Sequence, residues 1–109
     1  MKPNVPLGAA FAANLAALGE PLSPPAHRSM GSTDMGDVSH VVPAIHAYIA
    51  ICDQGVASHS HEFAQASVSE RGHRAMLLAA KALAMTAVDL YTDPDLVRKM
   101  REAFAAGES

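Results

Sequence analysis

The sequence predicts an α/β fold: a partial domain with a helix, a short capped turn, one or two strands and two C-terminal helices. Two observations lead to this prediction. Apolar residues recur at helical spacing over residues 7–18 and 68–90, whereas residues 41–52 are apolar on both sides of a two-residue alternation. A chain of 109 residues forms at most one domain. We therefore treat residues 1–109 as a single partial domain.

The first predicted helix covers residues 7–18, where Phe11, Leu15 and Leu18 fall on one face. Gly19 stands where a C-terminal helix cap belongs, because glycine adopts the left-handed conformation without strain. Residues 20–30 then contain three prolines and predict a surface connection, or the seam between two parts of a larger protein.

A short capped turn and a strand are predicted next. Ser32 or Thr33 can cap a helical turn through residues 34–38 by accepting backbone amide protons. Residues 41–52 are predicted to form a strand, with Ile45, Ala47, Ile49 and Ile51 on one face and Ala44, His46, Tyr48 and Ala50 on the other. Because both faces are mostly apolar, this strand is expected inside a sheet that is covered on both sides.

Two helices are predicted in the C-terminal part. Ser67 and Glu70 fit a capping box for a helix over residues 68–90, after a loop at residues 53–66. That helix is apolar around most of its circumference, which is typical of a helix buried between neighbours. The chain offers too few other elements to bury it, so we expect missing partner structure, either another chain or the rest of a longer protein. Asp93 is the expected N-cap of the last helix, which Gly107 ends.

Charge and composition exclude several classes of function. Eight Lys and Arg residues against eleven Asp and Glu give a net charge of −3, and no basic cluster fits a phosphate backbone, so we expect no nucleic acid partner. No uncharged apolar run reaches the ~18 residues that span a bilayer, so we expect no membrane association. Asn14 interrupts the apolar N-terminal run, which argues against a signal peptide. A lone cysteine, Cys52, fits a cytoplasmic protein.

The local candidate for chemistry is the segment HSHEF at residues 59–63. Imidazole and carboxylate groups bind Zn²⁺, and His59 and His61 would point the same way in an extended backbone. The alternative is a solvated polar loop, because the other histidines are scattered at positions 27, 40, 46 and 73. Cys52 near His59 could act as a nucleophile, although a small buried hydrophobe is the better interpretation. Asp34 and Asp37 could pair as carboxylates or simply stabilise a helix N-terminus.

The stretch GSTDMGDVSHVVP at residues 31–43, followed by HSHEF at residues 59–63, resembles the C-terminal segment of the zinc-dependent amidohydrolase and metallopeptidase family. That family includes aminoacylases, carboxypeptidase-like enzymes and enzymes of the aminobenzoyl-glutamate utilisation type. The resemblance implies the end of a di-zinc hydrolase catalytic domain, with His59 as the last metal ligand. It gives His61 no ligand role and gives Asp34 a substrate-binding role.

The resemblance also implies what the chain lacks. The family's other metal ligands and its catalytic glutamate belong to an N-terminal half, and this sequence has no His-x-Asp motif and no Glu-Glu pair. We therefore predict no catalytic residue here, and a fragment that is inactive alone. The parent enzyme would use two divalent metals, such as zinc, to hydrolyse an amide bond of an N-acyl amino acid, aminobenzoyl-glutamate or a dipeptide-like substrate. The alternative is a non-catalytic interaction module or homo-oligomer that uses the apolar helix at residues 68–90.

Overall fold

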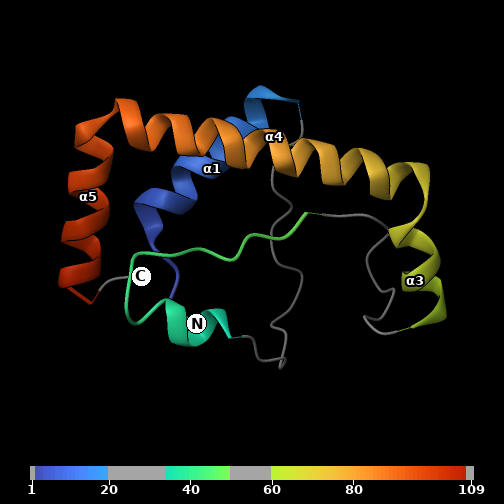
Figure 1. The fold of residues 1–109 in the computed structure, drawn as a ribbon, viewed down its shortest axis with the longest axis horizontal. Helices are drawn as coiled ribbons and strands as arrows, with labels where there is room; N and C mark the ends of the chain where they lie inside the picture. Colours follow the sequence, from blue (N-terminus) through green and yellow to red (C-terminus); the bar gives the residue numbers. More distant parts are fainter. Residues whose placement is uncertain (1, 20–33, 50–59, 108–109) are drawn as a thin grey trace.

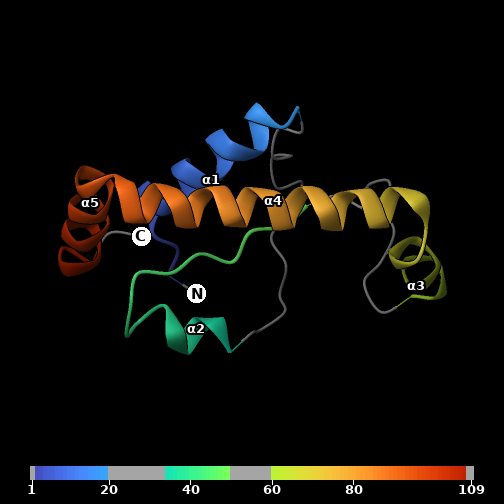
Figure 2. The same cartoon turned by 45° about the horizontal axis from the view of Figure 1, so that its top comes forward.

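The computed structural model describes residues 2–19, 34–49 and 60–107, and all regular structure in this part of the chain is helical (Figure 1). The helices in chain order are α1 (Val5–Ala17), α2 (Met35–Val38), α3 (His61–Ser67), α4 (Glu70–Thr92) and α5 (Pro94–Ala105). Helix α4 is the longest and extends along the molecule, with α5 at one end and α3 at the other (Figures 1 and 2). Helix α1 packs against both α4 and α5.

The predicted α/β class is wrong, because the described residues contain no strand. Residues 43–49 of the predicted strand have no regular secondary structure, and residues 50–52 lie outside the described part. A strand requires a neighbour whose backbone it can pair with. To another described segment, residues 43–49 make one backbone hydrogen bond, from Asn4 N–H to Ala44 O at 2.8 Å. A single bond does not make a ladder, so the extended sequence pattern forms no sheet here.

The predicted two faces of this segment are found only in part, because Ala47 is exposed between the two isoleucines and Ala44, on the other predicted face, is 7% exposed. Ile45 and Ile49 are half-buried and pack against the hydrophobic core. His46 and Tyr48 are exposed and stack on each other, with ring centroids 4.9 Å apart. Ile45 and Ile49 thus cover the core without strand pairing, and the segment does not present one apolar face as a regular strand would.

The hydrophobic core lies where α1 crosses α4. Phe11 and Leu15 of α1 are 3% and 0% exposed, and Ala82 of α4 is 0% exposed between them. Leu18 and the two isoleucines of the extended segment complete this cluster. The predicted inner face of the first helix is therefore confirmed. The small Ala82 side chain allows the two helices to approach closely at their crossing.

Asn4 connects three parts of the fold. Its backbone N–H makes the bond to Ala44 O, and its side-chain Oδ1 accepts from Leu7 N–H at 3.1 Å as the N-cap of α1. Its Nδ2 donates to Met100 O of α5 at 3.0 Å, and the residue is 3% exposed. A buried polar side chain is tolerated only when it is hydrogen-bonded, and this one is bonded at both its oxygen and its nitrogen.

A second polar contact fixes how α1 lies against α4. Asn14 Nδ2 donates to Thr86 Oγ1 at 3.0 Å and to Asp89 Oδ2 at 2.9 Å. Thr86 is buried, and its hydroxyl donates to Ala82 O at 2.7 Å. Because these groups must meet their partners, the network opposes sliding of α1 along α4.

The helix boundaries differ in part from those predicted. Helix α1 begins at Val5 instead of Leu7, and α3 (His61–Ser67) occupies the end of the predicted loop at residues 53–66. Helix α4 begins at Glu70, with Ser69 and not Ser67 as its N-cap. Ser67 belongs to α3, where its hydroxyl donates to Ala64 O at 2.7 Å. A cap needs extended backbone dihedrals, and Ser69 has them with φ −80° and ψ 166°.

The remaining helix ends agree with the predictions. Asp93 is the N-cap of α5, where its side chain accepts from Leu96 N–H at 3.2 Å, and Pro94 occupies the first turn. Gly19 and Gly107 follow the ends of α1 and α5 with φ of 87° and 76°. These positive values favour glycine because other residues place their Cβ in a steric clash there.

Helix α4 is long and apolar enough to cross a membrane by length and composition, although only 17% of its apolar window is buried within the molecule. Lys81 and Asp89 lie within this helix, and Asp89 accepts a hydrogen bond from α1. Charged residues near the middle of a span are costly in a bilayer. Lys81, in the middle of the helix, would therefore be costly to place across a bilayer.

Candidate functional site

The predicted site falls into two separate pieces, the turn around α2 and the helix α3. His59, the predicted metal ligand, lies outside the described residues, as do residues 31–33 of the first motif and Cys52. Asp34 and the segment from residue 60 onward are described. The geometry of the candidate site is therefore built from these two pieces.

Asp34 begins the turn that forms α2. It is exposed, and its backbone carbonyl accepts from Asp37 N–H at 3.1 Å and from Val38 N–H at 3.3 Å. Its carboxylate makes no capping hydrogen bond, and Ser32 and Thr33, the predicted caps of this turn, lie outside the described residues. The predicted turn through Asp34–Val38 is confirmed, and the carboxylate of Asp34 is exposed to solvent.

Ser39 connects this turn to the N-terminal residues by a hydrogen bond. It is 1% exposed, its hydroxyl accepts from Lys2 N–H at 2.9 Å, and it donates to Gly36 O at 2.7 Å. Lys2 in turn places its ammonium 5.4 Å from the ring centroid of Phe104 in α5. The turn that carries Asp34 is thus held against residues from both ends of the chain.

The histidine segment forms the first turn of α3. Ser60 is the N-cap, and its hydroxyl accepts from Phe63 N–H at 3.1 Å. His61 is exposed and its Nε2 lies 3.3 Å from Gln65 Nε2, one turn along the helix. Glu62 is exposed in the same first turn, where the positive end of the helix dipole stabilises its negative charge. The segment therefore supplies a capped helix start directly after His59.

Gly72 sets the corner between α3 and α4. A Cβ at this position would collide with Ala66 O and would lie 3.1 Å from Ser67 O. The backbone of α4 therefore approaches the end of α3 as closely as glycine alone allows. Because α3 begins at His61, this corner determines the direction in which the histidine segment leaves the body of the protein.

The described residues do not bring the two pieces together. Helices α2 and α3 are not in contact, and both views show them on different sides of the molecule (Figures 1 and 2). Within residues 2–19, 34–49 and 60–107, no group of three His, Cys, Asp or Glu side chains could hold a metal ion. His40, His46 and His73 are all exposed and scattered, as the sequence indicated.

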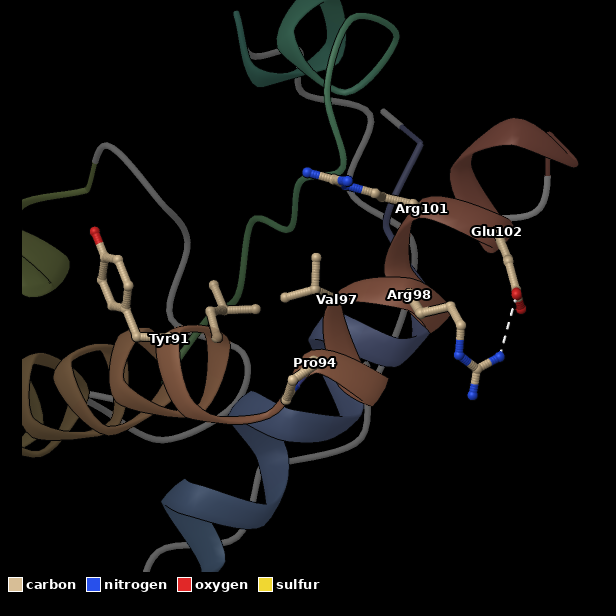
Figure 3. A pocket seen from close by; sticks show the side chains of 7 residues that line it. Tyr91, Pro94, Val97, Arg98, Arg101 and Glu102 are labelled. Atoms are coloured by element: carbon tan, nitrogen blue, oxygen red, sulfur yellow. Dashed lines mark hydrogen bonds and ion pairs between the residues drawn. The ribbon is translucent and has the colours of Figure 1, made fainter.

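A hollow lies elsewhere, at the corner between α4 and α5. Its volume is about 540 Å³, and it is lined by Leu90, Tyr91, Pro94, Val97, Arg98, Arg101 and Glu102. Figure 3 shows Tyr91 and Val97 from the two helices on its opposite sides. Glu102, which bonds Arg98 at 3.2 Å, and Asp95 raise the pKa of that guanidinium. The lining of the hollow combines apolar side chains with two guanidinium groups and one carboxylate.

Several residues that position these pieces are not evident from the sequence pattern. Asn4 falls in a segment expected to be an extended lead-in, although an asparagine before an alanine-rich run is a standard N-cap signal. Ser39 and Gly72 carry no such signal, because what makes them important is contact with residues far away in the sequence or around a corner.

Comparison with known proteins confirms the predicted resemblance over part of the chain. No family model matches the sequence. Human Xaa-Arg dipeptidase is 43% identical over 74 residues, which are 68% of this chain and 17% of that protein, and the mouse protein is 42% identical over 74 residues. A p-aminobenzoyl-glutamate hydrolase subunit of Escherichia coli K12 is 32% identical over 71 residues, which are 65% of this chain and 15% of that protein. The chain thus spans about a sixth of the length of these relatives and is homologous to a fragment of them.

Proposed function

Because this chain is homologous to one stretch of a dipeptidase and of an aminobenzoyl-glutamate hydrolase, we propose that it is a piece of a metal-dependent amidohydrolase or peptidase. The complete enzyme would cleave an amide bond in a dipeptide, an N-acyl amino acid or aminobenzoyl-glutamate, and would act in the cytoplasm. The single observation that carries this proposal is the 43% identity to human Xaa-Arg dipeptidase over 68% of the chain.

Within that proposal, His59 is the metal ligand and His61 is not. The position of His61 supports this assignment, because its side chain is exposed on α3 beside Gln65. Ser60, the next residue in the sequence, is the N-cap of α3. We assign Asp34 to substrate binding, because its carboxylate is exposed and can reach a bound molecule.

The chain alone is expected to be inactive. A catalytic zinc needs about three protein ligands, and the described residues hold no group of three that could supply them. The two predicted pieces also lie apart, so they cannot share a substrate in this arrangement. We therefore assign hydrolysis to a complete enzyme and not to these 109 residues.

A chimera tests the proposal. The stretch of human Xaa-Arg dipeptidase that matches this chain is replaced by the 74 matching residues, and hydrolysis of a dipeptide that ends in arginine is measured with added zinc. We expect the chimera to be active, because the transplanted stretch would supply the same ligand and scaffold. A chimera that folds with bound metal but shows no hydrolysis would contradict the proposal.

Two histidine variants of that chimera give a matched control. His59→Ala should abolish hydrolysis and reduce the bound metal, whereas His61→Ala should change neither, although both remove one imidazole from the same segment. Equal losses in the two variants would reject the assignment of His59. In parallel, detectable zinc-dependent hydrolysis by the isolated 109-residue chain would disprove the inactivity of the fragment.

A second candidate function is a non-catalytic interaction module. One observation favours it: α4 leaves large apolar side chains exposed, among them Met76, Leu77, Leu83 and Val88, each more than half accessible to solvent. Contiguous apolar surface of this kind marks interaction sites in soluble proteins.

A further inference from the structure

The hollow at the corner between α4 and α5 combines a half-buried apolar part with exposed polar side chains. Leu90 of α4 and Val97 of α5 are half-buried in its lining. Tyr91 and Arg101 are exposed, and Figure 3 shows them on the two sides of Val97. Its volume of about 540 Å³ falls within the range of about 300–1,000 Å³ that is usual for small-molecule sites. The hollow is therefore large enough for a small molecule with one apolar and one polar part.

The guanidinium of Arg101 has no acidic partner in the part of the chain that the structure describes. The ion pairs found within α5 both involve Arg98, which lies 3.5 Å from Asp95 and 3.2 Å from Glu102. The positions three and four residues before and after Arg101 in α5 hold no acid. A guanidinium presents its donors in a planar fork that matches a carboxylate. Arg101 therefore keeps this fork available for an anion from outside the described residues.

Glu102, the carboxylate in the lining, does not compete for Arg101. It accepts a hydrogen bond from Arg98 at 3.2 Å, and Figure 3 shows this pair on one side of α5. Arg101 extends away from the pair, toward the side on which Tyr91 lies (Figure 3). The lining holds two guanidinium groups and one carboxylate, which leaves one positive charge in excess. A small anion is therefore attracted to the hollow, although the whole chain carries a net charge of −3.

We propose that this hollow binds a small carboxylate that carries an apolar ring. The carboxylate pairs with the guanidinium of Arg101 through two parallel hydrogen bonds. The ring covers Leu90 and Val97 and packs against the ring of Tyr91, since aromatic rings attract each other in offset or edge-to-face contact. Inorganic phosphate fits less well, because it would leave the apolar lining in contact with water. The inference rests on the corner between α4 and α5 and does not depend on the hydrolase assignment.

The first test is a titration of the isotope-labelled 109-residue chain with hydrocinnamate, followed by the amide signals in NMR spectra. The signals of residues 90–102 and the side-chain Nε–Hε signal of Arg101 should shift, whereas those of α3 should not. We expect the shifts to saturate with a Kd of about 1 mM, which is usual for a ligand of this size.

Two analogues separate the parts of the ligand. Hydrocinnamamide keeps the ring but has no charge, and propionate keeps the charge but has no ring. Each should bind at least about threefold more weakly than hydrocinnamate, because each loses one of the two contacts. An amide that binds as tightly as the acid would show that no charge is recognised and would overturn the proposal.

Arg101→Gln tests the guanidinium. An exposed ion pair contributes up to about fivefold in affinity, so the Kd of hydrocinnamate should rise by about fivefold in this variant. Lys99→Gln is the matched control: it removes one positive charge from an exposed position of α5 outside the hollow and should change the Kd by less than about twofold. Equal losses in the two variants would indicate a general effect of charge and would reject the assignment of Arg101.

Tyr91→Ala tests the aromatic side of the hollow. The Kd should rise by about threefold when the ring of Tyr91 is removed. Tyr48→Ala removes a second exposed ring, 74% accessible to solvent and outside this hollow, and should leave the Kd unchanged. Circular dichroism should show the same helical content in all variants, since each replaces an exposed side chain.

Two further results with the unmodified chain would overturn the proposal. The first is the absence of saturable shifts at residues 90–102 up to the solubility limit of hydrocinnamate. The second is displacement of hydrocinnamate by an equal concentration of inorganic phosphate, which would make the hollow a general anion site without a role for its apolar lining. Both results are independent of how the variants fold.

Discussion

Asn4 is expected to be one of the most important polar residues for stability, although it lies near the end of the chain. Asn4→Ala removes the N-cap of α1, which typically costs about 1 kcal/mol of unfolding free energy. It also removes the donor to Met100 O, and a buried hydrogen bond of this kind contributes about 1 kcal/mol. The backbone bond from Asn4 to Ala44 is retained. We therefore expect a loss of about 2 kcal/mol in Asn4→Ala.

The assay is urea unfolding followed by circular dichroism, at one fixed protein concentration because association would add to the apparent stability. Asn4→Ser separates the two contributions: its hydroxyl can still cap α1 but is too short to reach α5. We expect Asn4→Ser to lose about 1 kcal/mol, roughly half the effect of alanine. An Asn4→Ala variant within about 0.5 kcal/mol of the unmodified chain, or a serine variant as unstable as alanine, would refute the reasoning.

Three further predictions follow from the packing. Gly72→Ala should lower the free energy of unfolding by about 1–3 kcal/mol, because the new Cβ would collide with the backbone of Ala66 at the corner between α3 and α4. Amide hydrogen exchange should become faster in α3 than in α1, and an equal increase in both helices would contradict this prediction. Thr86→Val should lower the free energy of unfolding in urea by about 1 kcal/mol, because it removes the hydrogen bond from Asn14. Thr92→Val is the control: it removes an exposed hydroxyl on the same helix and should lower the free energy of unfolding by less. Arg98→Gln should leave the urea midpoint unchanged, because its ion pairs with Asp95 and Glu102 are exposed, and a clear shift would show that they contribute.

The helices could be predicted from the sequence because their determinants are local. Phe11 and Leu15 share a face of α1 at spacing four, and both are buried. Asp93 and Pro94 mark the start of α5 through dihedral preferences that act within a few residues. The choice of Ser67 over Ser69 as the cap of α4 is wrong because both serines fit a local cap, and the close packing at Gly72 that ends α3 is not visible in the sequence.

The sheet could not be predicted correctly because a strand is defined by a partner. The alternation correctly places Ile45 and Ile49 against the core and His46 and Tyr48 outside it, but it fails for Ala44, which is buried, and for Ala47, which is exposed. It carries no information on whether a second strand lies beside the segment. In the described residues, the segment lies beside the N-cap of α1 instead of a second strand, and Asn4 makes one backbone hydrogen bond to it. The same limit applies to the site: the motif around His59 is recognised through a resemblance, and no spacing within this chain predicts a set of metal ligands.

The apolar circumference of α4 connects the two proposals. The sequence predicts a helix that needs neighbours all round, and the structure supplies them on one side, where α1 packs on Ala82 and bonds Thr86. The described neighbours leave the other apolar side chains of α4 exposed, among them Met76, Leu77, Leu83 and Val88. The remaining parts of the proposed hydrolase would cover this surface, and the alternative interaction module would use it to bind a partner. Both proposals therefore depend on the same exposed surface of α4, because a long apolar helix is stable in water when neighbours cover it.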